Sequence, residues 1–180
     1  NAIRHVKEFD SKSNRVWGMC YPEGTYASTQ VFFQALFNKD QVVYCYGDDF
    51  NLVNENLLRY EVSHLTCTPT FLQMILLHCK DENHFVRKLT TGGEKITNSI
   101  LKDFKKRFVS AKYLNVYATS ETGSLLSSTS EFFKIPNRYK DLVKINNNRI
   151  CVHKTLLNKK EELENIEDWY DTGDEVEFVD

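Results

Sequence analysis

The sequence lacks long apolar runs and lacks an excess of charge of either sign. None of its 180 residues lies in a stretch approaching the roughly 20 apolar residues of a membrane-spanning helix, and residues 1–10 contain no hydrophobic signal segment. The 23 Lys and Arg residues nearly balance 25 Asp and Glu residues, giving a net charge of -2. This balance provides no electrostatic reason to expect nucleic acid or an anionic membrane as a partner. We therefore expect no membrane span and no nucleic-acid partner.

Cysteine is also scarce and unpatterned. The five cysteines form an odd set without a C-x-x-C pair, which argues against a disulfide framework and favours a reducing compartment, the cytoplasm. Hydrophobic residues make up 41% of the chain, enough to form a core and to exclude a disordered chain. The length predicts one domain, with a small appendage at most.

The first two thirds of the chain alternate short β-branched or aromatic runs with amphipathic stretches. The predicted strands are residues 15–20, 41–45, 63–66, 87–90 and 112–116. This alternation favours parallel strands joined by helical crossovers. We expect a doubly wound, mostly parallel α/β sheet with flanking helices over residues 1–124, which would form the nucleotide-binding subdomain.

Two helix starts are marked by capping residues. Thr68 precedes Pro69, a combination typical of an N-cap followed by proline in the first turn. Thr97 precedes a second helix, predicted to end at Phe108, whose apolar residues fall on one sheet-facing stripe. Both helices are expected to pack on the sheet.

The pattern changes after Ser124. Residues 142–145 and 149–152 are short strand candidates on either side of three asparagines, which predicts a hairpin with left-handed turn residues. Residues 159–168 are dense in charge and predict a solvated helix or loop, and residues 176–179 predict one more strand. Residues 125–180 therefore predict the start of a small β subdomain.

Three polar segments, at residues 91–94, 115–123 and 169–174, could carry chemistry. The first two follow predicted strands, and ligands of open α/β sheets bind beyond the carboxyl ends of the strands. A tyrosine ring, hydroxyls and the Glu121 carboxylate together suit a nucleotide and Mg²⁺. Each segment taken alone is equally compatible with an ordinary turn, in which Gly92, Gly93 or Gly173 only relieves the backbone.

Taken together, the three segments resemble the adenylate-forming, or AMP-binding, superfamily of acyl-CoA synthetases, carrier-protein ligases, adenylation domains and luciferase. N-x-Y-A-T-S-E at residues 115–121 is similar to the family motif N-x-Y-G-x-T-E. G-G-E at residues 92–94 precedes it and Y-x-T-G-D at residues 170–174 follows it, as in the family. The similarity extends over essentially the whole chain, although Ala118 replaces the family's glycine and Ser120 its threonine.

The resemblance implies a role for each matching residue. Tyr117 would stack on adenine, Asn115 would hydrogen-bond its exocyclic amine, and Asp174 would bind the ribose hydroxyls. The same slot would be lined by the neighbouring residues Gly92, Gly93, Glu94 and Ala118. Ser120 would contact the α-phosphate or the acyl carboxylate, and Glu121 would hold Mg²⁺.

The implied reaction joins a small carboxylic acid to the α-phosphate of ATP, giving acyl-AMP and pyrophosphate. A thiol of CoA or of a carrier protein's phosphopantetheine then takes the acyl group. In the family, a phosphate loop with its lysine would precede Asn1 and a small domain with a catalytic lysine would follow Asp180. We therefore expect this stretch to be a central fragment that is inactive alone.

The substrate clue lies at residues 25–28, which align with the F-D-A-S stretch of amino-acid-activating members. Tyr26 replaces the aspartate that pairs with the substrate ammonium, and a buried ammonium without a carboxylate is costly. If this register holds, Tyr26, Ala27 and Gln30 face an acyl pocket for an aryl or fatty acid; alternatively, Tyr26 only packs the core. An amino-acid-activating domain and a non-catalytic nucleotide-binding module of the same fold remain the alternatives.

Overall fold

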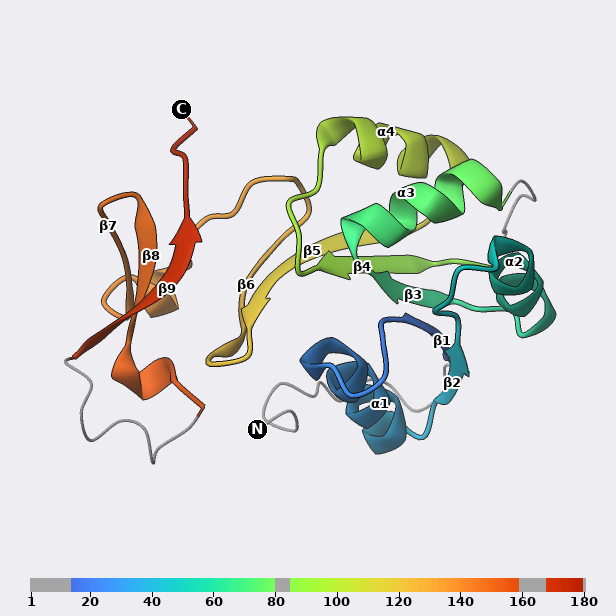
Figure 1. Cartoon of the computed structure of the whole chain (residues 1–180), viewed down its shortest axis with the longest axis horizontal. Helices are drawn as coiled ribbons and strands as arrows, with labels where there is room; N and C mark the ends of the chain where they lie inside the picture. Colours follow the sequence, from blue (N-terminus) through green and yellow to red (C-terminus); the bar gives the residue numbers. More distant parts are fainter. Residues whose placement is uncertain (1–13, 80–84, 159–167, 180) are drawn as a thin grey trace.

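The computed structural model describes residues 14–79, 85–158 and 168–179 (Figure 1). In chain order the elements are β1 (Val16–Cys20), α1 (Tyr26–Asn38), β2 (Gln41–Tyr44), α2 (Phe50–Arg59), β3 (His64–Cys67), α3 (Pro69–His78), β4 (Lys88–Gly92), α4 (Asn98–Arg107), β5 (Lys112–Thr119), β6 (Gly123–Ser128), β7 (Val143–Asn146), β8 (Arg149–His153) and β9 (Trp169–Glu175). Short 3-10 helices lie at Asn137–Tyr139 and Lys154–Leu156. Within these ranges, no helix combines the length and the apolar character that crossing a bilayer requires.

Six strands form the main sheet, in the order β2-β1-β3-β4-β5-β6. The first five pair in parallel and β6 is antiparallel to β5. Helices α3 and α4 lie on one side of this sheet and α1 on the other (Figure 1). The predicted fold class, a doubly wound and mostly parallel α/β sheet followed by a small β unit, is therefore confirmed.

The two predicted helix caps are confirmed by their hydrogen bonds. The side chain of Thr68 accepts from the backbone N–H of Phe71 at 3.2 Å, with Pro69 in the first turn of α3. The side chain of Thr97 accepts from the N–H of Ile100 at 3.4 Å and opens α4. Each cap satisfies an N–H that the helix itself leaves unpaired.

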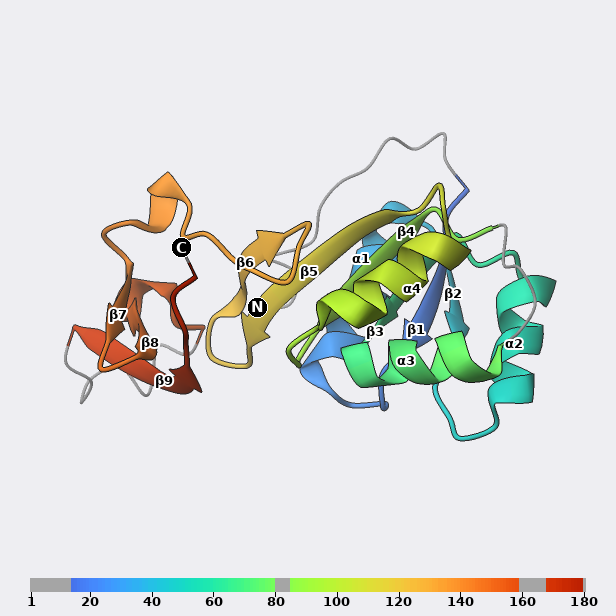
Figure 2. The same ribbon diagram turned by 90° about the horizontal axis from the view of Figure 1, so that it is seen from above.

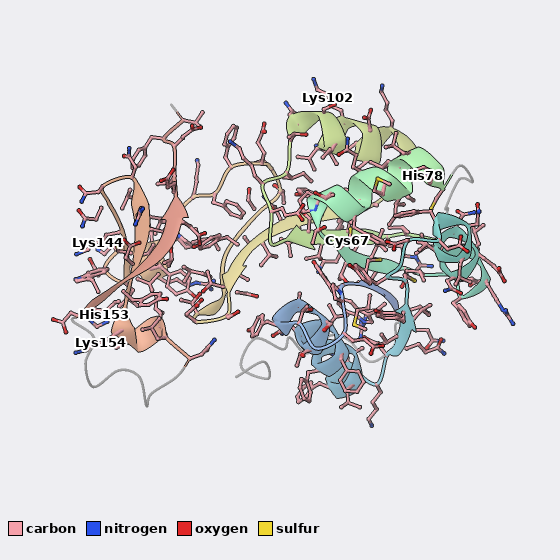
Figure 3. All side chains as sticks on the ribbon, viewed as in Figure 1. Cys67, His78, Lys102, Lys144, His153 and Lys154 are labelled. Atoms are coloured by element: carbon pink, nitrogen blue, oxygen red, sulfur yellow. The ribbon has the colours of Figure 1, made fainter. Side chains whose placement is uncertain are left out.

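A row of small side chains crosses the sheet near its carboxyl edge. The row contains one residue from each of β1, β3, β4 and β5, paired in register across the sheet: Cys20, Cys67, Thr91 and Asn115. Each of them is at most 3% exposed. Burial raises the pKa of the Cys20 and Cys67 thiols, which keeps them protonated. Cys67 is labelled in the middle of the molecule in Figure 3. All five cysteines are buried, and none of them is in a disulfide.

Apolar side chains form three clusters. The largest lies between the sheet and helices α2 to α4 and includes Leu65, Leu72, Leu89 and Phe104, all fully buried. A second cluster joins the sheet to α1 through Trp17, Tyr21, Val31 and Ala35. The third links β6 to the small sheet β7-β8-β9. Viewed from above, the long strand β5 reaches from the main sheet toward this small sheet (Figure 2).

The predicted asparagine hairpin is confirmed as β7 and β8, whose residues Asn146 and Arg149 pair across the turn. Asn147 and Asn148 have φ values of 50° and 58°, the left-handed pair that a tight two-residue hairpin requires. The main-sheet strand β6 crosses the division expected after residue 124, so the two-subdomain boundary stays a proposal.

The strand predicted at residues 176–179 is wrong. The strand that pairs with β8 is Trp169–Glu175, and its last backbone contact is the N–H of Val176 with the carbonyl of Asn148. By that point β9 has paired along the whole length of β8, which has five residues. Among the described residues, the apolar residues that follow therefore have no further strand to pair with. Phe178 is accordingly 78% exposed. The charged segment predicted as a solvated helix or loop lies, apart from Asp168, outside the described residues.

At the amino ends of the strands, a buried carboxylate between α1 and β2 binds two side chains of the β1 segment. Asp40 Oδ2 accepts from Arg15 Nε at 2.8 Å and from Trp17 Nε1 at 2.9 Å. The side chains of Arg15 and Asp40 are only 6% and 3% exposed. Beside them, the ring of His64 lies 4.9 Å from that of Trp17, measured between ring centroids.

His64 makes the stability of this cluster depend on pH. Burial lowers its pKa to about 4, and Lys88, Arg15 and Arg87 act in the same direction while Asp40 opposes them. An unfolded histidine titrates near ~6.5, so the unfolded chain binds the extra proton between the two values. We expect stability to fall as pH drops from about 6.5 toward about 4. Urea midpoints across this window should fall less steeply for His64→Gln, and an unchanged slope would remove His64 as the cause.

Candidate active site

The candidate residues of the first two motifs lie at one edge of the main sheet. Because β1, β3, β4 and β5 are parallel, the loops that follow them leave the sheet at the same carboxyl edge. The loops after β4 and β5 hold Glu94 and Glu121, and the loop after β1 leads to Tyr26, the first residue of α1. The topology therefore gathers segments that are far apart in the sequence.

Each residue of the G-G-E segment has a distinct structural role. A Cβ on Gly92 would lie 2.9 Å from the carbonyl oxygen of Val116, so only glycine allows β4 this close to β5. Gly93 has φ +85°, the left-handed region that favours glycine. Glu94 Oε2 accepts from Thr70 Oγ1 at 2.6 Å and from Thr70 N–H at 3.0 Å, at the start of α3. Thr70 thus ties this loop to α3.

Strand β5 carries the central motif. Asn115 is 3% exposed, and its Nδ2 donates to the carbonyl of Ser130 at 3.3 Å, which orients the amide. With Nδ2 engaged in this way, Oδ1 is the acceptor that an exocyclic amine would need. The pairing with β6 shifts register between Tyr117 and Ala118. Ala118 is not among the residues with positive φ, so alanine fits here without the strain that would demand glycine.

Tyr117 and Asp174, 57 residues apart in the sequence, meet directly. The Tyr117 hydroxyl donates to Asp174 Oδ2 at 2.5 Å, and it also lies 3.4 Å from Thr172 Oγ1. The Tyr117 ring packs edge-on against Phe133, with centroids 6.3 Å apart. Burial, the bond to Asp174 and the charge of Glu121 raise the pKa of the Tyr117 phenol, so it stays a neutral donor.

An irregularity in β9 brings Asp174 to this position. Between the pairs Arg149↔Glu175 and Cys151↔Asp171, β9 has two more residues than β8, and Gly173 in this bulge has φ +81°. Thr172 Oγ1 donates to the carbonyl of Ile150 at 2.9 Å and accepts from the N–H of Asp174 at 3.2 Å. Thr172, the threonine of the Y-x-T-G-D motif to which the sequence assigned no role, therefore fixes the aspartate.

Ser120 and Glu121 form the exposed turn between β5 and β6. Thr119 Oγ1 accepts from the N–H of Thr122 at 3.1 Å across the turn, and Gly123 closes it with φ +71°. Glu121 lies near enough to Tyr117 for its charge to affect that phenol. An exposed carboxylate and a neighbouring hydroxyl are oxygen donors of the kind that Mg²⁺ accepts, so this turn fits the metal.

The predicted acyl-pocket residues lie at the start of α1. The Tyr26 hydroxyl lies 3.4 Å from Gln30 Oε1, and burial raises the pKa of Tyr26. Tyr26, Ala27 and Gln30 are each half-buried, and Tyr26 is not part of the apolar cluster under α1. Among the described residues, no hydrogen bond or ring contact joins these three to Tyr117 or Asp174. Their role as substrate contacts stays a prediction.

A separate surface groove of about 520 Å³ lies between α3 and α4. Its lining includes Leu76, Leu77, Ile100 and Asp103, and none of the predicted site residues. The candidate site is therefore defined by the contacts at the carboxyl edge and not by this groove.

Comparison with known proteins identifies the family. A profile of AMP-binding enzymes matches residues 1–150. The chain belongs to the AMP-binding enzyme family. A search of curated proteins finds no match.

Solved structures share the fold of this AMP-binding chain. The N-terminal domain of FACL13 from Mycobacterium tuberculosis superposes with a TM-score of 0.70 at 12% identity, over 98% of this chain and 53% of that one. O-succinylbenzoate coenzyme A synthetase (MenE) from Bacillus subtilis, in complex with ATP and magnesium, gives 0.66 at 14% identity over 90% and 39%. A long-chain-fatty-acid-CoA ligase (FadD1) from Archaeoglobus fulgidus gives 0.63 at 11% identity over 92% and 41%. The AMP-binding chain thus spans roughly half or less of each.

Proposed function

We propose that this chain is part of an ATP-dependent acid-thiol ligase that adenylates a small carboxylic acid. The observation that carries the proposal is the hydrogen bond between Tyr117 and Asp174 at the carboxyl edge of the sheet. It places an aromatic ring beside a carboxylate, as binding of adenine and its ribose requires. Membership of the AMP-binding family, and solved neighbours named as CoA synthetases and ligases, support the same reaction class.

In the proposed complex the adenine stacks on the Tyr117 ring and donates from its amine to Asn115 Oδ1. The Asp174 carboxylate exchanges its bond with the Tyr117 hydroxyl for bonds from the ribose hydroxyls. Gly92 and Gly93 leave the wall of this slot free of side chains, while Glu94 and Ala118 complete it. The nucleotide is thereby held at its base and sugar, which leaves the phosphates directed toward the Ser120 turn.

The reaction then needs positioning and charge neutralisation, and no protein nucleophile. A carboxylate oxygen of the acid attacks the α-phosphorus of ATP, the bond to the β-phosphate breaks, and pyrophosphate leaves with its electron pair. Ser120 donates a hydrogen bond to the α-phosphate or to the attacking carboxylate, and Glu121 holds the Mg²⁺ that neutralises the phosphates. In the second half-reaction a thiolate of CoA or of a carrier phosphopantetheine attacks the acyl carbon and AMP leaves.

The reaction class can be tested with full-length protein by acid-dependent exchange of pyrophosphate into ATP. Exchange with aryl or fatty acids supports the proposal and the assignment of Tyr26, Ala27 and Gln30 to the acyl pocket. Exchange with amino acids alone would overturn the interpretation of Tyr26. ATP binding without exchange for any acid would favour a nucleotide-binding module without catalysis.

Substitution of Tyr117 tests the nucleotide slot itself. Tyr117→Ala removes the stacking surface, worth about 1–3 kcal/mol per base, so we expect AMP to bind about ten- to a hundredfold more weakly. Tyr117→Phe keeps the ring and loses only the hydroxyl contacts with Asp174 and Thr172, so it should retain most of the affinity. Titration calorimetry with AMP measures both variants. Equal losses for the two, or none for alanine, would contradict stacking at this residue.

A further inference from the structure

One residue outside the motifs holds both residues of the proposed catalytic turn. Asn158 Nδ2 donates to the carbonyl of Ser120 at 3.3 Å, and its backbone N–H donates to the carbonyl of Glu121 at 2.6 Å. These bonds join segments 38 residues apart in the sequence. The 3-10 helix Lys154–Leu156, which leads into Asn158, lies on the small-sheet side of the molecule, where Lys154 is labelled in Figure 3.

The pairing of β5 with β6 closes the turn on both sides, at Thr119 and Gly123. Its internal side-chain bonds run between Thr119 and Thr122 and do not involve Ser120 or Glu121. A hydrogen bond to a backbone carbonyl fixes the peptide plane and hence the direction in which the neighbouring side chains leave the chain. Because Asn158 binds two successive carbonyls, it fixes two successive peptide planes of an exposed loop.

Asn158 is itself held by the small sheet. The preceding residue Leu157 is buried in the cluster that contains Val143 and Val152, and its N–H donates to the carbonyl of Lys154 at 3.1 Å. Lys154 Nζ in turn pairs with Asp168 at 2.9 Å. The hydrogen bonds from Asn158 to the turn therefore come from a residue whose own position is fixed by packing against the small sheet.

We propose that Asn158 is a positioning residue for Ser120 and Glu121. It directs the Glu121 carboxylate and the Ser120 hydroxyl toward the phosphates and their metal. The inference rests on the proposed function and extends it. In this view the small-sheet part of the chain binds the ribose through Asp174 and orients the turn of Ser120 and Glu121 through Asn158.

Nucleotide binding with and without Mg²⁺ tests the tether in full-length protein. Asn158→Ala removes the side-chain bond, and Asn158→Leu does so while roughly keeping the volume. We expect either change to weaken binding of ATP with Mg²⁺ about tenfold, the effect of one lost hydrogen bond. Metal-free AMP should lose less affinity, because it keeps the α-phosphate that Ser120 contacts but carries no metal for Glu121 to hold. In a Glu121→Gln background the further loss should shrink to the loss seen with AMP, because the part that acts through Glu121 is already gone.

Thr155→Ala is the matched control. Its hydroxyl bonds His153 Nδ1 at 2.9 Å in the same segment and does not contact the turn, so both affinities should stay at the unsubstituted level. Full ATP and Mg²⁺ affinity in Asn158→Ala and Asn158→Leu would overturn the proposal, as would an equal loss of AMP binding or an equal loss in Thr155→Ala. Failure of both variants to fold would make Asn158 a folding residue and also overturn it. Absence of ATP binding in the unsubstituted protein would instead reject the proposed function.

Discussion

Glu121→Gln in the full-length protein is expected to lower acid-dependent pyrophosphate exchange by about a hundredfold or more. The amide keeps the shape of the side chain and removes the negative charge that a Mg²⁺ ligand needs. Glu121 is exposed on the turn between β5 and β6, so the free energy of unfolding should change little. Exchange kinetics and thermal unfolding of the same sample separate the two effects.

A second carboxylate provides the control for this prediction. Glu55 is exposed on α2, where it pairs with Arg59 at 3.7 Å on the surface, and Glu55→Gln removes the same charge far from the proposed site. Its exchange rate should equal that of the unsubstituted protein. Exchange at full rate in Glu121→Gln would remove the metal assignment, and equal losses in both variants would indicate a general charge effect.

Asp40→Ala is expected to be the most destabilising single change considered, by about 3–5 kcal/mol. It removes the carboxylate beside the buried guanidinium of Arg15 and, with it, the acceptor of the Trp17 indole N–H. The charged group would stay in the interior without the partner that offsets its desolvation. Chemical denaturation of the purified protein, monitored by tryptophan fluorescence, measures the loss.

Asp48→Ala serves as the comparison for this prediction, because Asp48 lies exposed in the bend before α2. It should change the free energy of unfolding by no more than about 0.5 kcal/mol. If the two aspartate variants lose the same stability, the buried pair is not the source of the effect.

Local signals were sufficient for much of the fold. The helix caps at Thr68 and Thr97 and the asparagine hairpin depend on neighbouring residues, which the sequence displays directly. Strand β6 was not predicted, because its sequence G-S-L-L-S-S has weak β propensity and becomes a strand by folding back on β5. The error at residues 176–179 has a similar origin, since alternation shows what could be a strand and not which segment finds a partner.

In the candidate site, too, some residues could be predicted from local sequence and others could not. Tyr117, Glu121 and Asp174 could be named because three motifs occur in the order of a known family, and the contact between Tyr117 and Asp174 agrees with their pairing. The roles of Thr70, Thr172 and Asn158 could not be predicted, although Thr172 belongs to the third motif, because each acts through hydrogen bonds to other segments. Only the three-dimensional structure brings those partners together.

Strand β5 belongs to two apolar cores at once: Tyr113 packs in the cluster beneath α4, and Tyr117 packs against the cluster of the small sheet. A nucleotide bound between Tyr117 and Asp174 would contact both the main sheet and the small sheet. By thermodynamic linkage the bound nucleotide would then oppose separation of the two sheets, and the stabilisation would grow with the logarithm of its concentration relative to its Kd. By reciprocity, a substitution that weakens the packing between the two sheets also weakens nucleotide binding, even if the substituted residue does not contact the ligand.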